Sequence, residues 1–485
     1  MAQISKDSKI IIVGAGVFGL STALWLAKSG YASVTVYDQQ PYFTNSYRDG
    51  ADGASADINK IIRFSYGKEI EYQRLAFEAS KIWDEWNQQL ADLKQSSEDA
   101  GLPPGLNAGD KLWFNSGMLR MSVADGYDDF EQETLKNMEK EKGLREKQFE
   151  CGNEADLRRA QELGWAHKLD PFHRKEQGRP HSAVLDTTAG FVAAGRSCLW
   201  AIHLCQRAGV KFELGPQAGK LRKLLSITNG SIHGIETEDG QSHFADLVVV
   251  ACGGWTPAIL PEASKSIETT AGSVVTVRIP RKNKELWDRY APENMPVFTW
   301  GMKEGKGMYG FPRMDDGIVK FGYRATKWTN FDKVDGKTIS VPKTAYTPEK
   351  ETNIPLISLN AVKGFISEFL PELESLGIHS TRLCWYTDSI DNSFLIDHVP
   401  SRPGLMICSG GSGHGFKFLP ILGREVVKII EGKEKNVYGE MWRWRTSKDG
   451  AKNNGLEEGP NGPRVLSKLK MASDKDWQFG GSSRL

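Results

Sequence analysis

Short hydrophobic runs alternate with a helical repeat at the start of the chain. Residues 9–13 (KIIIV) form an apolar, β-branched run, which is typical of a strand buried on both faces. Residues 20–30 (LSTALWLAKSG) have apolar positions at helical spacing and end at a glycine, and residues 33–38 (SVTVYD) form a second apolar strand. The pattern predicts a strand, a helix and a second strand in that order.

Five later segments extend this organisation. Residues 68–95 carry apolar positions at helical spacing, and residues 125–180 are strongly charged with a helical pattern, which predicts a peripheral or second-domain segment. Residues 247–251 (LVVVA) predict another buried strand. Residues 256–380 contain many aromatics in alternating strands, and residues 405–432 repeat the order of strand, glycine turn and helix. The first sheet is therefore expected to receive a strand from late in the chain.

These elements predict an α/β fold with two domains. We expect a Rossmann-like dinucleotide-binding domain and a second α+β domain built on a mostly antiparallel sheet. The first domain is expected to be discontinuous and to hold residues 1–105, 185–256 and 380–435. The second is expected to hold residues 106–184 and 257–379, and the polar, glycine-rich residues 436–485 are expected to form an irregular tail.

Composition narrows the range of partners. The chain has 485 residues, of which 39% are hydrophobic, so it can bury more than one core. Lysine and arginine total 62 against 61 aspartates and glutamates, and this balance gives no positive field for holding nucleic acid. No run approaches the roughly 20 apolar residues of a membrane span, and residues 1–10 lack the apolar region of a secretory signal. We expect a soluble protein that is not exported by that route.

The cysteines favour neither a disulfide framework nor a metal site. Six cysteines are spread over the chain without the short paired spacing of zinc ligands or dense disulfides. No metal is therefore expected, and a cysteine with a special role must act alone. The six are Cys151, Cys198, Cys205, Cys252, Cys384 and Cys408.

A glycine-rich turn joins the first strand to the first helix and predicts a dinucleotide site. Gly14 permits a tight turn, Gly16 lets the backbone approach a pyrophosphate, and Gly19 lets the helix lie close to the strand. The N-terminus of the helix offers unpaired N–H groups to phosphates. Asp38 ends the second strand, where a carboxylate can bind ribose hydroxyls. Nothing in this first unit distinguishes FAD from NAD.

Five segments in order resemble the glycine and D-amino-acid oxidase superfamily of flavoenzymes. The most similar branch holds monomeric sarcosine oxidase, the pipecolate and saccharopine oxidases and the fructosyl-amino-acid oxidases (amadoriases). The segments are IIVGAGVFGLSTALWLAKSG with Asp38, SADINKIIRFSYG at 55–67, VVVACGGWT at 248–256, YGFPRMDDGIVKFGYR at 309–324, and RLCWYTDSIDNSFLID followed by CSGGSGHGFKFLP.

The resemblance implies a GR2-type FAD-binding domain and a monomeric amine oxidase. Such an enzyme removes hydride from the carbon of a secondary amine's C–N bond and passes the electrons to O2, which gives an imine and hydrogen peroxide. In this branch the cysteine at the position of Cys384 forms a thioether to the flavin 8α carbon. Residue type alone favours a small buried hydrophobe at Cys384, and it is the adjoining WYTDSIDNSFLID that favours the covalent link.

The resemblance also assigns roles to several cations. Arg63 and Lys417 look like the pair that holds the substrate carboxylate, and an arginine suits this because its donors form a planar fork. Lys320 looks like the lysine that activates O2, because an adjacent cation stabilises superoxide. Lys60 aligns with a cation near the flavin. Each could instead be an ordinary surface, strand or helix-start cation.

Two further positions concern the substrate. Tyr309 looks like a tyrosine beside the substrate, although an aromatic before Gly-Phe-Pro could also be core. Arg324 stands where sarcosine oxidases have a histidine, and this added cation suggests a bulkier or more acidic substrate, or an altered pocket. His414 is expected to contact flavin or to pack, and it receives no role in proton transfer.

The expected site residues therefore form two sets. The catalytic or substrate-binding set is Lys320, Lys60, Arg63, Lys417, Tyr309 and Arg324. The cofactor-binding set is Gly14, Gly16, Val17, Phe18, Gly19, Asp38, Ser55, Lys60, Gly253, Trp255, Cys384, Gly411, Gly413, His414, Gly415, Phe416 and Lys417.

The leading functional expectation is an oxidase of N-substituted or N-methyl amino acids with covalently bound FAD. The alternatives are a fructosyl-amino-acid oxidase, a biosynthetic oxidase that couples amine oxidation to ring closure, an NAD(P)-linked dehydrogenase and a non-catalytic flavoprotein. The chain has no second GxGxxG for a further nucleotide. The final residues Ser483, Arg484 and Leu485 resemble a peroxisomal address read by an import receptor, so a peroxisomal or otherwise cytoplasmic location is expected.

Overall fold

The structure is a computed structural model that describes most of the chain. It covers residues 4–40, 46–47, 50–95, 101–141, 143–228, 230–400, 402–432, 436–445 and 458–480. The expected peroxisomal address, Ser483, Arg484 and Leu485, lies outside the described residues. In the described part, no helix has both the length and the apolar character needed to cross a membrane.

A six-stranded sheet collects strands from the beginning, the middle and the end of the chain. Its neighbours pair in parallel except β21 with β22, and β1 lies near the centre between β13 and β2. The central strands are β-branched and buried on both faces, as the hydrophobic runs predict. In spatial order the strands are β21 (Leu395–His398), β22 (Leu405–Ser409), β13 (Leu247–Val250), β1 (Lys9–Val13), β2 (Ser33–Asp38) and β9 (Lys211–Leu214).

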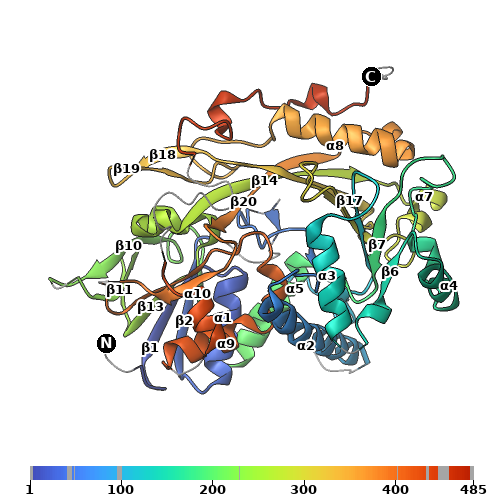
Figure 1. The fold of residues 1–485 in the computed structure, drawn as a ribbon. Coiled ribbons are helices and arrows are strands. Elements are labelled where there is room, and N and C mark those ends of the chain that lie inside the picture. The colour runs from blue at the N-terminus through green and yellow to red at the C-terminus, as the bar shows by residue number, and fades with distance from the viewer. Residues whose placement is uncertain are drawn as a thin grey trace.

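Helices cover one face of this sheet. Figure 1 shows α1 (Val17–Lys28) and α9 (Leu422–Ile430) beside each other over the strands, with α5 (Ala194–Arg207) and α10 (Val437–Trp442) nearby. The approach of α9 to α1 is close, because a Cβ on Gly423 would collide with the backbone oxygen of Ser21. The long helix α2 (Ile70–Gln95) adds Trp83 and Trp86 to the same core.

An eight-stranded sheet forms the second layer, and it is antiparallel throughout except where β15 pairs with β5. The expectation of a mostly antiparallel second sheet is therefore confirmed. Helix α8 (Leu356–Phe369) covers its outer face (Figure 1). In spatial order the strands are β20 (Ser380–Ser389), β14 (Ile267–Arg278), β17 (Ile318–Trp328), β16 (Met308–Gly310), β15 (Val297–Trp300), β5 (Met118–Met121), β7 (Ala183–Asp186) and β6 (Gln148–Glu150).

Three small sheets and several helices complete the described fold. The sheets are β3 (Asn59–Ile62) with β8 (Gly190–Ala193) and β4 (Trp113–Phe114), β10 (Leu221–Ser226) with β11 (Ile232–Thr237) and β12 (Ser242–Phe244), and β18 (Phe331–Val334) with β19 (Lys337–Ser340). The remaining α-helices are α3 (Asp129–Lys140), α4 (Glu154–Glu162), α6 (Thr256–Ile259) and α7 (Lys284–Arg289). Short 3-10 helices include η4 (Gly253–Trp255) and η7 (Phe416–Phe418).

Two expected boundaries need correction. Residues 380–389 were assigned with the dinucleotide-binding domain, but β20 pairs with β14 over ten residues and is an edge strand of the eight-stranded sheet. The tail from residue 436 is not irregular throughout, because α10 lies in it and Trp442 is fully buried. Burial of this one large aromatic side chain anchors a segment whose composition is otherwise polar.

Candidate active site

A cavity of about 710 Å³ lies where the two large sheets meet. Its walls come from the glycine turn after β1, from β3, from β17 and β20 of the second sheet, and from the second glycine-rich turn at 410–415. Every expected site residue lines this cavity except Gly19. The volume is within the range of cofactor and ligand sites.

The first glycine turn has the geometry of a phosphate cradle. Gly14 has φ +108°, and a Cβ there would lie 2.5 Å from the Ala251 carbonyl oxygen. A Cβ on Gly19 would collide with the Gly14 oxygen, so this glycine acts through close packing of α1. At Gly16 no side chain caps α1, while Ser55 Oγ accepts a hydrogen bond from Val17 N at 3.1 Å. The turn leaves the helix N-terminus open to an anion.

Asp38 and the second turn complete the nucleotide end. The Asp38 carboxylate accepts hydrogen bonds from Ala15 N at 2.7 Å and Gln40 N at 2.9 Å, and a carboxylate keeps further lone pairs for ribose hydroxyls. Cβ atoms on Gly411 and Gly415 would lie 3.1 Å and 2.7 Å from the Phe18 ring. Gly253 (φ +51°) and Trp255 also line the cavity. These residues fit an adenine dinucleotide.

Cys384 lies between two cations. It is 7% exposed on β20, with Lys60 Nζ and Arg382 Nη2 each 3.7 Å from its sulfur. The sulfur therefore faces two charged side chains rather than an apolar core. Sequence reasoning missed Arg382, although it stands two residues before Cys384 and so on the same face of the strand.

Asp57 is a buried carboxylate that contacts all the cations around Cys384. Its Oδ2 lies 2.9 Å from Lys320 Nζ and 2.7 Å from Lys60 Nζ, and its Oδ1 lies 3.7 Å from Arg382 Nη2. Burial alone would raise the pKa of Asp57, but these three cations outweigh it and hold the pKa well below its usual value. Sequence reasoning did not single out Asp57, since two of its three partners, Lys320 and Arg382, are distant in the sequence.

Burial lowers the pKa of Lys320 to about 8, and Lys60 adds to this as a like charge, although Asp57 opposes both. Lys320 is 1% exposed, and its Nζ also donates to the Asn59 carbonyl at 2.7 Å. For Lys60, the Asp57 carboxylate outweighs burial and raises the pKa. The two lysines share one carboxylate, yet the pKa of Lys320 is lowered and the pKa of Lys60 is raised.

Arg63 and Lys417 form a second group at another end of the cavity. Lys417 is 2% exposed and donates to Tyr66 Oη at 2.8 Å, while the Arg63 guanidinium lies 4.5 Å from the Tyr66 ring centre. Burial and the adjacent Arg63 lower the pKa of Lys417 well below its usual value. Among the described residues, neither cation forms an ion pair with a carboxylate. An anion bound here would recover energy by stabilising their charged forms.

His414 connects to this group through Tyr66. Its Nε2 lies 2.9 Å from the Asn392 carbonyl and its Nδ1 lies 3.1 Å from Tyr66 Oη. A carbonyl can only accept, so Nε2 carries the proton and Nδ1 accepts from the tyrosine. Burial, with Lys417 as the next largest cause, holds the pKa of His414 well below its usual value. His414 is therefore a neutral, fully bonded ring at the edge of the cavity.

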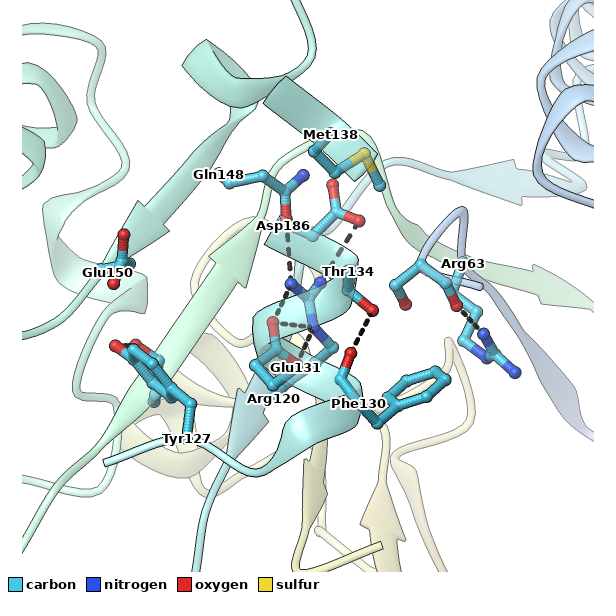
Figure 2. Close-up of polar contacts among 12 residues, drawn as sticks. Arg63, Arg120, Tyr127, Phe130, Glu131, Thr134, Met138, Gln148, Glu150 and Asp186 are labelled. Atoms are coloured by element: carbon cyan, nitrogen blue, oxygen red, sulfur yellow. Dashed lines mark hydrogen bonds and ion pairs between the residues drawn. The ribbon is translucent and has the colours of Figure 1, made fainter. Parts of the chain in front are cut away.

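An arginine-centred cluster fixes helix α3 over the far wall of the cavity. Figure 2 shows Arg120 reaching from β5 toward Glu131 on α3, Asp186 on β7 and Gln148 on β6. Arg120 donates to Glu131 at 2.7–3.1 Å and to Gln148 at 3.0 Å, and its Nη1 lies 3.4 Å from Asp186. Phe130 extends from the same turn of α3 toward the side where Arg63 lies (Figure 2). Sequence reasoning missed this cluster.

The family assignment follows from a match that covers most of the chain. A family described as FAD dependent oxidoreductase matches residues 9–429. The chain belongs to this family. The expected superfamily and α/β fold are thereby confirmed, as is an FAD-dependent oxidase. The glycine cradle, Asp38 and the second turn are the residues of this oxidoreductase that would hold FAD.

Known relatives of this oxidoreductase match over nearly their whole lengths. L-saccharopine oxidase of Schizosaccharomyces pombe is 27% identical, and the alignment covers 90% of this chain and 93% of the relative. Monomeric sarcosine oxidase of a Bacillus species is 26% identical, with 89% and 94% covered. The structure of fructosyl peptide oxidase from E. terrenum has a TM-score of 0.77 and 25% identity, with 97% and 99% covered.

The Arg120 cluster predicts which of two substitutions lowers the free energy of unfolding more. Arg120→Met leaves two buried carboxylates, Glu131 and Asp186, without their cation and should lower the free energy of unfolding by about 3–5 kcal/mol. Glu131→Gln leaves the Arg120–Asp186 contact in place and should cost less than half as much. Urea unfolding at saturating FAD, followed by tryptophan fluorescence, measures both variants. Equal losses would mean that the charge balance of the cluster does not determine its stability.

Proposed function

We propose that the chain oxidises the C–N bond of a secondary-amine amino acid to an imine and reduces O2 to hydrogen peroxide, with FAD attached through Cys384. The observation that carries this proposal is the pair of Arg63 and Lys417, which line one end of the cavity. Burial lowers the pKa of both and Glu69 opposes this shift, but among the described residues neither cation forms a direct ion pair with a carboxylate. Bound FAD supplies the hydride acceptor for such a reaction and returns the electrons to O2.

The charges around the cavity suit an acidic amine. Arg63 offers planar donors and Lys417 a point charge whose head is fixed by Tyr66, and together they can hold a carboxylate in one orientation. A substrate nitrogen must be neutral before hydride leaves the adjacent carbon. The same two cations disfavour a protonated amine close to them, because like charges repel in a site of low dielectric constant.

The oxygen-activating role belongs to Lys320. It is fully enclosed and is held by Asp57 and the Asn59 carbonyl, so its charge is preorganised rather than mobile. A fixed cation stabilises the negative charge that develops when O2 takes up an electron. Cys384 lines the cavity with its sulfur 3.7 Å from both Lys60 and Arg382, and this placement supports the covalent attachment.

One alternative substrate class has an observation in its favour. The similarity to fructosyl peptide oxidase over nearly the whole chain supports an oxidase of fructosyl amino acids. Both classes are secondary amines with a carboxylate, so the pair of Arg63 and Lys417 suits substrates of either class. A biosynthetic oxidase that closes a ring after imine formation would use the same first step.

The proposal is tested by peroxide release from purified protein. Sarcosine, pipecolate, N-methylated aromatic amino acids and fructosyl-valine should be compared at equal concentrations, with the matching primary amino acids as controls. Release from secondary amines only is expected. A protein that lacks a flavin absorption band, or that produces no peroxide from any amine, would contradict the proposal.

Attachment through Cys384 makes a separate prediction. In Cys384→Ser, acid precipitation should release yellow FAD into the supernatant, because serine cannot form the thioether, whereas the unmodified protein should keep its colour in the pellet. Cys151→Ser is the matched control, since Cys151 is also buried but lies outside the cavity. Flavin that stays with precipitated Cys384→Ser would rule out this attachment.

Lys320 should govern the reaction with O2. Lys320→Met should slow reoxidation by O2 on the order of 100-fold while anaerobic reduction by substrate changes much less. Because its pKa is lowered to about 8, the charged form is present below that pH and is lost above it, so the reoxidation rate should fall as pH rises through about 8. Stopped-flow reoxidation measures both, and the variant should lack this pH dependence. Equal slowing of both half-reactions would contradict the role.

A further inference from the structure

Another cation, Arg324, lines the cavity apart from the Arg63–Lys417 pair. It follows Lys320 by four residues on β17, so both side chains leave the same face of the strand. Gly322 lies between them, and a Cβ there would collide with the ring of Tyr309. The tyrosine therefore fills the gap between the two cations and separates them.

The surrounding backbone makes room for the arginine. A Cβ on Gly413 would collide with the Arg324 guanidinium, and a Cβ on Gly272 would lie 3.5 Å from Arg324 Cγ. Gly413 therefore leaves space for the planar head, while the stem is at ordinary packing distance from Gly272, and the Tyr386 ring centre is 5.3 Å from the guanidinium carbon. These contacts give the guanidinium a defined position on the cavity wall.

Arg324 keeps its charge, because Tyr386 and Asp388 outweigh burial and raise its pKa, but among the described residues it has only one ion-pair contact, at the limit of that range. The nearest carboxylate is Asp388 at 4.0 Å, and this carboxylate already contacts Lys327 Nζ at 2.9 Å and accepts from Thr270 Oγ1 at 2.6 Å. Arg324 Nε is buried and has no hydrogen-bond partner among the described residues. A buried donor without a partner is costly, so this position is suited to an acceptor that arrives with a ligand.

Arg324 adjoins the first anion site. It is near enough to lower the pKa of Arg63 and of His414, although burial is the largest cause for both. Its guanidinium lies against the Gly413 position, next to His414 in the sequence, whereas Tyr309 separates it from Lys320. The cavity therefore offers two neighbouring positions for negative charge, one at Arg63 and Lys417 and one at Arg324.

We propose that Arg324 binds a second substrate carboxylate, so that the substrate is a secondary amine with a carboxylate on each of its two N-substituents. The first carboxylate binds at Arg63 and Lys417 and the second at Arg324, whose planar fork matches a carboxylate. This assignment rests on the proposed function, and it names the substrate class of the same site. It separates the chain from oxidases whose substrates carry one carboxylate.

Binding of two unreactive acids tests the subsite without catalysis. Thiodiacetate has two carboxylates and methylthioacetate has one, and both carry sulfur in place of the amine. Calorimetry with the FAD-bound protein should show thiodiacetate binding at least about tenfold more tightly, as expected for a second charged hydrogen-bonded contact. Equal affinities would overturn the proposal, even if no variant could be prepared.

Variants assign the preference to Arg324. Arg324→Met should remove most of the difference in affinity (the margin) between thiodiacetate and methylthioacetate. Arg324→Lys should keep part of this margin, because a lysine retains the charge without the planar fork. Lys303→Met is the matched control. Lys303 lines the same cavity but lies over Phe130, so its loss should leave the margin within about threefold. The assignment would be overturned if Arg324→Met kept the margin. It would also be overturned if Arg324→Met and Lys303→Met lost the margin equally.

Catalysis separates failure of this inference from failure of the proposed function. Iminodiacetate and sarcosine differ by one carboxylate, and Arg324→Met should reduce kcat/KM for iminodiacetate about tenfold more than for sarcosine, mainly through KM. Peroxide from both amines with no differential loss contradicts the Arg324 subsite alone. If neither amine nor any other secondary amine yields peroxide, the proposed function fails, and the calorimetric comparison still decides the subsite.

Discussion

One buried carboxylate beside the cavity has to balance three cations. Asp57 is within 2.9 Å of both Lys320 and Lys60, and Arg382 is 3.7 Å away. Removing charges from water is expensive, and a group of like charges is tolerated in the interior only where a counter-charge is well placed. With one negative charge for three positive ones, this region keeps a net positive field. Such a field favours the negative charge that develops when O2 takes up an electron.

Strand pairing in the antiparallel sheet brings Cys384 on β20 close to Arg324 on β17. On β14, Gly272 pairs with Cys384 on one side, and Ser273 next to it pairs with Tyr323 on the other. Gly272 lines the cavity, and the stem of Arg324 lies beside it. The position proposed for flavin attachment and the position proposed for the second carboxylate are therefore separated by a single strand.

The features that could be predicted from the sequence are those set by residues close together in the chain. The strand, the glycine spacing of Gly14, Gly16 and Gly19, and Asp38 all lie within one short unit, so their arrangement follows from local pattern. The Asp57 and Arg120 clusters could not be predicted in this way, because most of their members come from distant segments that only the folded sheets bring together. The boundary at residue 380 was wrong for the same reason: β20 is assigned by its pairing with β14, which leaves no trace in composition.

The hydrogen-bond chain from Lys417 explains why the carboxylate end needs no general base from His414. The Asn392 carbonyl requires a proton on His414 Nε2, so Nδ1 accepts from Tyr66, whose oxygen in turn accepts from Lys417. Both ring nitrogens of His414 and the Tyr66 hydroxyl are hydrogen-bonded. The imidazole therefore cannot take up a further proton without breaking one of these bonds, and the added charge would lie beside two cations. These bonds orient the Lys417 head and keep the histidine neutral, so the positive charge at this end is left to meet the carboxylate of the proposed substrate.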